Sequence, residues 1–581
     1  MLFIGILFCF FHILSIYVHA NNEIPTNQFN GLQALYASTN GDNWLWESTV
    51  GHWNFTNPNV NPCINQWAGI DCYAGCSNIT TSTCIIANIT LEDYNMVGTL
   101  PEELFYMTDL QSLSFFYNYI SSTIPTNMGN LTSLLTLDIS DNYLSGTVPY
   151  SIGDLSQLSL LRLDYNSMTS SLPRSMETLT KLQQLFIASN QLTGTFPESL
   201  TKLYQLANIN MDHNQFNSSI PSEISQLSHL YALRCSNNCL SGSLPSSIGL
   251  LSMMTALMLD HNTLTGSIPT EFSELAVVNQ FSLGFNFLTG ALPPAIGEMG
   301  IAFILLNNNM LSNTIPTSIT NYIGLDTIDL SDNDLNGTIP SNLNELTGLR
   351  ALFAYSNRFT GTIPSTIGEL TVLDVIYLLN NYLTGTIPKI SAMYHILDLY
   401  FNNNQLTGPI PSLMSNCSYL QDFIFDNNQL TGTIPTDIFE IPFLIYFYIN
   451  HNNLNGTIPQ VVNENDRLKY VYLNYNSLSG TIPSSLVLLR GLEYLYLDTN
   501  QLTGSIPSNL GLITYLWDLI LHNNRLTGTI PTQMGSIGSV NIAFNGITGS
   551  IPSILGDFTS MHYYNISGTQ VGELMCVYVY I

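Results

Sequence analysis

The stretch LEYLYLDTNQLTGSIPSNLGLITY, residues 492–515, decides how this chain folds. Around Leu495, apolar residues alternate with polar or aromatic ones, which indicates a short strand with one buried face. Asn500 follows the strand, and its side-chain amide can satisfy backbone groups where the chain turns inward. Gly504 permits a tight bend, and Pro507 brings no N–H that needs a partner. The stretch therefore predicts one coil of a larger structure, made of a strand, a turn and an irregular return segment.

The same pattern recurs along most of the 581 residues. An apolar residue followed by Pro returns at a spacing close to 24 residues, and twenty of the 26 prolines are in phase. Asn stands seven residues before that proline in nineteen of the twenty units, from Asn118 to Asn545, and Tyr94 replaces it in the first. Each unit offers apolar side chains that only the next unit can cover, so we expect a stacked solenoid.

The unit Leu-x-x-Leu-x-Leu-x-x-Asn-x-Leu-x-Gly-x-Ile-Pro-x-x-Ile/Leu-Gly resembles the plant-type leucine-rich repeat. That family includes ectodomains of receptor-like kinases and receptor-like proteins, and polygalacturonase inhibitors. The resemblance implies an α/β-type repeat solenoid, a right-handed leucine-rich-repeat superhelix with a parallel β-sheet on the concave face and short 3-10 or irregular segments on the convex face. It covers residues 88 to about 566 and implies extracellular ligand binding without naming the ligand.

Four clustered cysteines precede the repeats, and they suit either disulfides or a zinc site; the export signal described below favours disulfides. Pro62-Cys63, Trp67-Ala-Gly-Ile70 and Cys72 resemble the N-terminal cap of the same family. The segment from Leu32 to Trp44, with Trp53, resembles a cap opening of secreted leucine-rich-repeat proteins from protists, algae and bacteria. Two further cysteines depart from the simple cap and suggest a second local bridge, so the expected pairs are Cys63 with Cys72 and Cys76 with Cys84.

The expected organisation is a signal peptide at 1–20, a disulfide-bonded cap at 21–87, about twenty repeats at 88–560, and a partial repeat with a short tail at 561–581. An uncleaved membrane anchor is the alternative for the first segment. No later apolar stretch reaches 18 residues, so no membrane span is expected in this chain. We therefore expect the protein to be secreted or extracellular. It would stay at the cell surface if the signal is uncleaved or if the chain is a truncated receptor.

Charge and sequons agree with export. The net charge is −28 with 12 Lys plus Arg, the first of them Arg162, which argues against nucleic acid or an anionic membrane as partner. Asn-x-Ser/Thr sequons predict glycosylation in a secreted chain. They begin at Asn54, Asn78, Asn88, Asn130, Asn217, Asn336, Asn416, Asn455 and Asn565.

Signs of catalysis are weak. The sequence has no phosphate-binding loop, no His-Glu-x-x-His and no Gly-x-Ser-x-Gly, so we expect no enzyme, cofactor or metal. Two Asp-His pairs, at 212–213 and 260–261, lie two repeats apart, roughly 9.6 Å, too far to share an ion, and are interpreted as solvated polar residues. Cys235 and Cys417 are expected in the core, and Cys239 is expected as an exposed free thiol.

Aromatic residues gather at two outward strand positions in the second half of the chain. Column A stands four residues before the repeated Asn and comprises Phe353, Tyr377, Tyr400, Tyr448, Tyr472 and Tyr496, with Ile424 between them. Column B stands six before it and comprises Tyr446, Tyr470 and Tyr494. Contiguous exposed aromatics mark interaction sites, so these nine are the candidate ligand-binding residues. Cross-strand stacking that only stabilises the sheet is the alternative.

Two classes of function fit these features. The first is a recognition module, either a receptor-like ectodomain or a soluble inhibitor, that binds an extracellular protein, peptide or glycan on its concave face, with a co-receptor as a further partner. The second is a structural or protective protein of the cell surface or matrix. A truncated fragment of a leucine-rich-repeat receptor kinase is a third origin for the same chain. The aromatic columns favour recognition, because Tyr offers large contact area at low entropic cost.

Overall fold

The computed structural model describes residues 24–46, 51–56, 60–73, 76, 84–552 and 562–571. The expected signal peptide, sequon Asn78 and the tail beyond residue 571 lie outside these ranges. The chain divides into two compact units, Met1–Gln280 (unit 1) and Phe281–Ile581 (unit 2). Each unit is a stack of coils of the predicted kind, called rungs below, and the expected α/β repeat solenoid is confirmed.

The first strand of each rung joins a main sheet. In unit 1, β1 is antiparallel to β2 and the following strands are parallel and in register. These strands are β1 Ile70–Cys72, β2 Ile86–Thr90, β4 Ser112–Ser114, β6 Thr136–Asp138, β8 Leu160–Arg162, β10 Gln184–Phe186, β12 Asn208–Asn210, β14 Ala232–Arg234 and β16 Ala256–Met258, and β18 Gln280–Ser282 begins at the unit's last residue.

In unit 2 the main strands are again parallel and in register. They are β20 Phe303–Leu305, β22 Thr327–Asp329, β24 Ala351–Phe353, β26 Val375–Tyr377, β27 Asp398–Tyr400, β29 Asp422–Ile424, β31 Tyr446–Tyr448, β32 Tyr470–Tyr472, β34 Tyr494–Tyr496, β36 Asp518–Ile520, β38 Ser539–Asn541 and β40 Tyr563–Asn565. The last of these is the twenty-first repeat strand, which lies parallel to β38.

A second strand follows the turn in most rungs, and these strands form shorter parallel sheets. In unit 1 they are β3 Val97–Gly98, β5 Tyr119–Ile120, β7 Ser145–Gly146, β9 Ser167–Ser170, β11 Gln191–Thr195, β13 Gln215–Ser218, β15 Cys239–Ser243 and β17 Thr263–Gly266. In unit 2 they are β19 Phe287–Ala291, β21 Met310–Asn313, β23 Asp334–Gly337, β25 Arg358–Phe359, β28 Thr407–Gly408, β30 Gln429–Leu430, β33 Ser479–Thr481, β35 Gln501–Gly504, β37 Arg525–Leu526, β39 Thr548–Gly549 and β41 Gln570–Val571.

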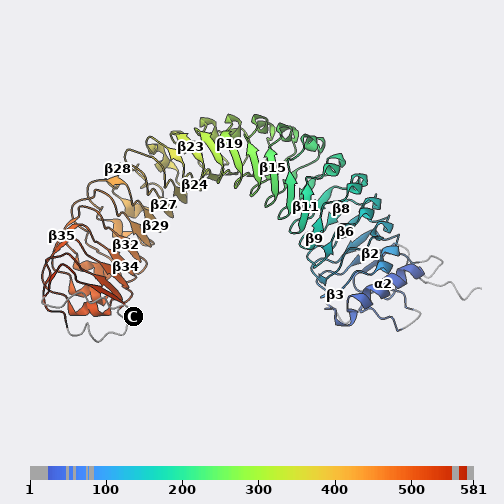
Figure 1. Cartoon of the computed structure of the whole chain (residues 1–581), viewed down its shortest axis with the longest axis horizontal. Helices are drawn as coiled ribbons and strands as arrows, with labels where there is room; N and C mark the ends of the chain where they lie inside the picture. Colours follow the sequence, from blue (N-terminus) through green and yellow to red (C-terminus); the bar gives the residue numbers. More distant parts are fainter. Residues whose placement is uncertain are drawn as a thin grey trace, which may run out of the picture. The chain divides into compact units, whose positions relative to one another are not determined.

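Short 3-10 turns after the repeated proline complete most rungs. Within each unit they lie on the side opposite to the main sheet (Figure 1). Unit 1 has η2 Glu102–Tyr106, η3 Met128–Asn130, η4 Tyr150–Asp154, η5 Arg174–Thr178, η6 Glu198–Lys202, η7 Ser222–Gln226, η8 Ser246–Leu250 and η9 Thr270–Glu274, and a further turn, η1 Gly41–Asn43, lies in the cap. Unit 2 has η10 Pro294–Gly297, η11 Thr317–Thr320, η12 Leu343–Glu345, η13 Ser365–Glu369, η14 Met414–Asn416, η15 Ile438–Glu440, η16 Ser484–Leu488, η17 Ser508–Leu512 and η18 Thr532–Ser536.

The core lies between the main sheet and the 3-10 turns of each rung. Leu495, Leu497 and Leu502 are fully buried, and Ile506 and Ile513 are nearly so. The inward positions predicted from residues 492–515 are therefore correct. Gly504 has φ +76°, and a Cβ there would lie 2.8 Å from Thr481 Cγ2 in the preceding rung, so the glycine is required both by its conformation and by the close stacking.

The repeated Asn forms a hydrogen-bonded ladder between rungs. Asn500 Nδ2 donates to the carbonyl oxygens of Leu473 at 3.0 Å, Leu497 at 3.2 Å and Asp498 at 3.2 Å. Its Oδ1 accepts from the N–H of Leu478 at 2.9 Å. Leu473 and Leu478 belong to the preceding rung, so one side chain closes the turn of its own rung and completes the turn of the rung before it. The predicted role of the repeated Asn is confirmed.

A helical cap packs beside the first repeats of unit 1. Helix α2, Thr26–Ser38, buries Leu32 and Leu35, and its Gln28 accepts the N–H of Ile86 in β2 at 2.9 Å. Trp44 and Trp53 are buried in an aromatic cluster, and each indole N–H donates to a backbone carbonyl oxygen. Each indole thus adds buried apolar area and leaves no polar group unpaired.

Candidate functional site

Columns A and B lie on the solvent-facing side of the main sheet of unit 2, called the strand face below. Register places Tyr446, Tyr470 and Tyr494 directly beside one another on β31, β32 and β34. The tyrosines of column A at 448, 472 and 496 follow the same register two residues further on. All nine candidate residues are half-buried rather than fully exposed. Buried Ile424, 6% exposed, separates Phe353, Tyr377 and Tyr400 from the others.

The rings within each column stack on one another. Neighbouring centroids in column B lie 4.8 and 4.9 Å apart, with Tyr470 in the middle. In column A, Tyr472 lies 4.3 Å from both Tyr448 and Tyr496, with interplanar angles of 3° and 4°. Both faces of the two middle rings are therefore covered by other rings, and only ring edges and hydroxyls face solvent. The cross-strand stacking that the sequence offered as the alternative is therefore present, because in-register strands bring successive rings to stacking distance.

Carboxylates complete the strand face, and they were missed in the sequence. Tyr377 donates to Asp398 at 3.2 Å, Tyr400 to Asp422 at 2.6 Å and Tyr496 to Asp518 at 2.8 Å. These three acids stand six residues before the ladder Asn, the position that column B occupies in the rungs between them. Reading that position along every rung would have revealed them.

Electrostatics distinguishes the first two acids. The pKa of Asp398 is raised to about 6, chiefly by burial and also by the neighbouring charge of Asp422, while the hydrogen bond from the Tyr377 hydroxyl opposes the shift. Burial also raises the pKa of Asp422. Burial likewise raises the pKa of Tyr400, and the hydrogen bond to Asp422 adds to the rise, so this hydroxyl stays a donor. By contrast, the three hydroxyls of column B have no hydrogen-bond partner within the part of the chain that the structure describes.

The Asp-His pairs of unit 1 form no shared ion site. Ser236 lies between their acids: its N–H donates to Asp212 at 2.6 Å and its hydroxyl donates to Asp260 at 2.7 Å. His261 contacts its own Asp260 at 3.0 Å. Asp212 is half-buried rather than fully solvated, and burial raises its pKa to about 6. The interpretation of these pairs as solvated polar residues holds for the exposed His213 and His261, whereas Asp212 is only partly exposed.

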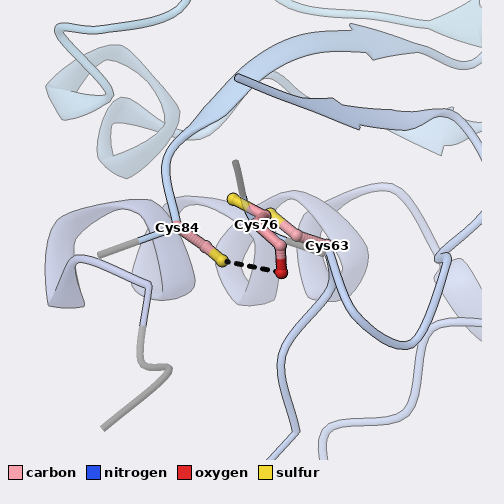
Figure 2. A group of neighbouring side chains, drawn as sticks. All are labelled: Cys63, Cys76 and Cys84. Atoms are coloured by element: carbon pink, nitrogen blue, oxygen red, sulfur yellow. Dashed lines mark hydrogen bonds between the residues drawn. The ribbon is translucent and has the colours of Figure 1, made fainter. Parts of the chain in front are cut away.

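The cap cysteines form one bridge. Cys63 is bonded to Cys72, as expected. The expected second bridge is wrong for this structure, because Cys76 and Cys84 carry free thiols. Figure 2 shows Cys84 pointing toward the backbone of Cys76, where its thiol contacts the carbonyl oxygen at 3.9 Å. Burial and the neighbouring Cys76 thiol raise the pKa of Cys84 to about 11.

The same cluster was the candidate for zinc. The sulfurs of Cys63, Cys76 and Cys84 lie within 4.8 Å of one another, and among the described residues this is the grouping that could hold a metal. The disulfide uses Cys63, which leaves two thiols, fewer than the four ligands of a structural zinc site. Elsewhere, Cys235 and Cys417 are buried and Cys239 is exposed, as predicted.

The sequons inside the described ranges differ in exposure. Exposed sequon asparagines are Asn54, Asn130, Asn217, Asn336, Asn416 and Asn455, whereas Asn88 and Asn565 are half-buried in main strands. Asn217, Asn336 and Asn455 share one position, three residues after the ladder Asn, on the flank beyond the turn. Within the described ranges, no helix combines the length and apolar character needed to cross a membrane.

Family models match three parts of the chain: a leucine-rich repeat region at residues 101–220, and leucine-rich repeats at 324–346 and 442–502. A search of the curated proteins finds no match. Among solved structures, the plant peptide hormone receptor RGFR1 in complex with RGF2 is 27% identical, with a TM-score of 0.77, over 87% of this chain and 91% of that one.

Two more solved structures are similar over most of their length. The PEPR1–AtPEP1 complex is 28% identical, with a TM-score of 0.75, over 94% of this chain and 82% of that one. The Arabidopsis HAESA ectodomain, in complex with an IDA peptide hormone, is 29% identical, with a TM-score of 0.73, over 88% of this chain and 90% of that one. The repeats, the ladder and these similarities together show that the chain is a leucine-rich-repeat solenoid that is similar to the ectodomains of plant receptor kinases.

Proposed function

We propose that this chain is an extracellular recognition module that binds an extended peptide across the strand face of unit 2. The observation that carries the proposal is the register of columns A and B, which places three aromatic side chains on β24, β26 and β27 and six on β31, β32 and β34 of that face. A polypeptide chain can lie along such a face and contact several strands at once. The resembling ectodomains support a peptide, since three of them are described as complexes with RGF2, AtPEP1 and an IDA peptide hormone.

Ring stacking determines how the ligand makes contact. Because neighbouring rings cover each other, the ligand meets ring edges and hydroxyls rather than ring faces. Column B supplies hydroxyls that can donate to peptide carbonyls or accept from peptide N–H groups. The acids at 398, 422 and 518 border the columns and favour a peptide with basic side chains. Stacking fixes the rings before the ligand arrives, which lowers the entropic cost of binding.

Glycosylation is consistent with this placement. In unit 2 the exposed Asn336 and Asn455 lie on the flank beyond the turn, not on the strand face. Glycans there would cover the flank and leave the columns open. A co-receptor is proposed as a second partner, since another HAESA structure, 26% identical with a TM-score of 0.69, is described as a complex with IDA and the co-receptor SERK1.

The test removes hydroxyls without disturbing the stack. The secreted chain is screened on arrays of synthetic unstructured peptides and of oligosaccharides, and captured probes are retested against the triple variant Tyr446→Phe, Tyr470→Phe and Tyr494→Phe. Each lost hydrogen bond costs about 0.5–1.5 kcal/mol, so we expect peptide affinity to fall at least tenfold with an unchanged melting temperature.

The matched control is Tyr382→Phe, at an exposed tyrosine outside the columns. This substitution should leave peptide capture intact. Capture of oligosaccharides in place of peptides would refute the proposed ligand class. Equal peptide affinity of the triple variant and the wild type would refute the proposed surface.

A further inference from the structure

A second aromatic site lies in unit 1, independent of the strand face of unit 2. Four tyrosines, Tyr117, Tyr119, Tyr143 and Tyr165, line a recess of about 280 Å³. They flank the ladder asparagines of three successive rungs, either one residue before or one residue after them. Because these positions repeat at each rung, the stacking of rungs brings the four rings around one recess.

The four rings are more exposed to solvent than the rings of columns A and B. Each is between 46% and 59% exposed. The rings of Tyr119 and Tyr143 lie 6.0 Å apart and are tilted by 33°, which leaves their faces only partly covered. None of the four hydroxyls has a hydrogen-bond partner among the residues described. Large aromatic groups left open to water around a hollow mark a binding site more often than isolated exposed residues do.

The backbone shows that tyrosine is costly at two of these positions. Tyr117 and Tyr165 have φ +55° and +53°, in the left-handed region. A bulky side chain is disfavoured there, and most other rungs place Asn, Asp, Ser, Thr or His at this position. Phe285, Tyr475 and Phe544 stand at the same position with positive φ, so what distinguishes Tyr117 and Tyr165 is their grouping around the recess.

One acid, Asp141, belongs to the recess. It lines the recess and makes no side-chain hydrogen bond or ion pair within the described part of the chain. Arg162 contacts Asp138 and Asp164, at 3.7 and 3.6 Å, and does not line the recess. The recess thus combines electron-rich ring faces with a carboxylate that forms no ion pair among the described residues, although the positive charge of Arg162 acts on it from beyond ion-pair distance.

Hydrogen-bonding capacity decides between a cation and a sugar. Asn118 and Asn142 also line the recess, but both are buried ladder residues whose amides bind backbone groups. Their side chains are therefore not free to bind sugar hydroxyls, and the phenol hydroxyls and one carboxylate remain. Aromatic rings around a carboxylate match the chemistry of an alkylated ammonium ion, which is attracted by ring faces and needs few hydrogen bonds.

We propose that the tyrosine recess of unit 1 binds an alkylated ammonium group of the trimethylammonium class. The ring faces attract the diffuse positive charge, and Asp141 neutralises it. The chain's net charge of −28 concentrates cations near its surface and favours the same class of ligand. A partner carrying such a group, whether a small molecule or a modified side chain, would dock here while a peptide occupies the strand face of unit 2.

The experiment titrates the secreted full-length chain with choline and with 3,3-dimethyl-1-butanol, its neutral counterpart of the same shape. Binding is followed by calorimetry and by ligand-observed NMR. We expect choline to bind with a dissociation constant on the order of 1 mM, and the neutral alcohol at least fivefold more weakly. Equal binding of the two probes, or no binding of choline, would overturn the proposal.

Variants locate the site. Tyr143→Ala should weaken choline binding about tenfold, whereas Tyr143→Phe should retain it because the ring face remains. Asp141→Asn should weaken it several-fold and reduce its dependence on salt. The matched control is Tyr150→Ala, at a 75% exposed tyrosine outside the recess, which should have no effect. Unchanged binding in both Tyr143→Ala and Asp141→Asn would show that choline binds elsewhere and would refute the assignment.

Discussion

Replacing Asn452 by Leu tests the ladder, and the structure fixes the size of the effect. Asn452 Nδ2 donates to the carbonyls of Phe425, Ile449 and Asn450, and Oδ1 accepts the N–H of Leu430 at 2.9 Å. Counting four independent hydrogen bonds would suggest a loss of roughly 4 kcal/mol or more. That estimate is too large, because each of the three carbonyl oxygens also accepts a hydrogen bond from another donor.

Each carbonyl keeps another donor when Asn452 is removed. The carbonyl of Phe425 still accepts from Asn428, that of Ile449 from Asn476, and that of Asn450 from the Asn427 N–H. Only the N–H of Leu430, a buried residue, loses its acceptor. One stranded buried donor costs about 1–3 kcal/mol, so we expect Asn452→Leu to lower the free energy of unfolding by about 2 kcal/mol.

The assay combines chemical unfolding with amide hydrogen exchange. Exchange of the Leu430 amide should accelerate much more than that of neighbouring core amides, because its protection depends on Asn452 directly. Asn453→Leu, at the adjacent exposed residue, is the control and should leave both measurements within about 0.5 kcal/mol of the wild type. The reasoning fails if both variants unfold alike, or if Asn452→Leu costs more than about 5 kcal/mol, since the shared carbonyls would then not compensate.

Two further outcomes follow from titration and burial. In the folded chain Asp398 has a pKa of about 6, above its ordinary value of 3.8, so between about pH 4 and pH 6 the folded chain holds a proton that the unfolded chain has released. The free energy of unfolding therefore falls as pH rises through this window, and Asp398→Asn should flatten the fall when denaturant midpoints are measured at each pH. A wild-type stability that rises over this window relative to the variant would show the sign to be wrong. In native thiol labelling followed by mass mapping, exposed Cys239 should react well before buried Cys235 and Cys417, whose thiol pKa values burial raises; simultaneous labelling of all three would contradict the described packing.

The repeat itself could be predicted from sequence because each of its positions has a local physical reason. Asn500 has to satisfy backbone groups, Gly504 has to adopt a positive φ, and Leu495 has to be covered by a neighbour. These needs recur with the period, so twenty copies identify one coil without any long-range information. The strand face followed from the same register, which is why columns A and B lie where they were predicted.

What the sequence could not supply was the relation between side chains in different rungs. Stacking of Tyr470 on its neighbours was one of two alternatives that the sequence left open, and only the arrangement of rings on strands about 4.8 Å apart decides that the rings stack. Cys76 and Cys84 are close in sequence, yet a bridge requires an alignment of both side chains that spacing does not encode. The tyrosine recess was missed because its residues flank the ladder instead of sharing one strand position.

The ladder also gives the stack a direction. Every inter-rung bond of a ladder Asn described here reaches backward: Asn500 serves Leu473 and Leu478, both earlier in the chain. A coil therefore finishes its turn only when its successor has arrived, while it needs no Asn from its predecessor. The last coil of such a stack therefore lacks the Asn acceptor that the N–H equivalent to that of Leu478 finds in the coil after it. Within the ladder, loss of the following coil leaves an N–H without its Asn acceptor, whereas loss of the preceding coil leaves an Asn oxygen without its donor, the milder loss.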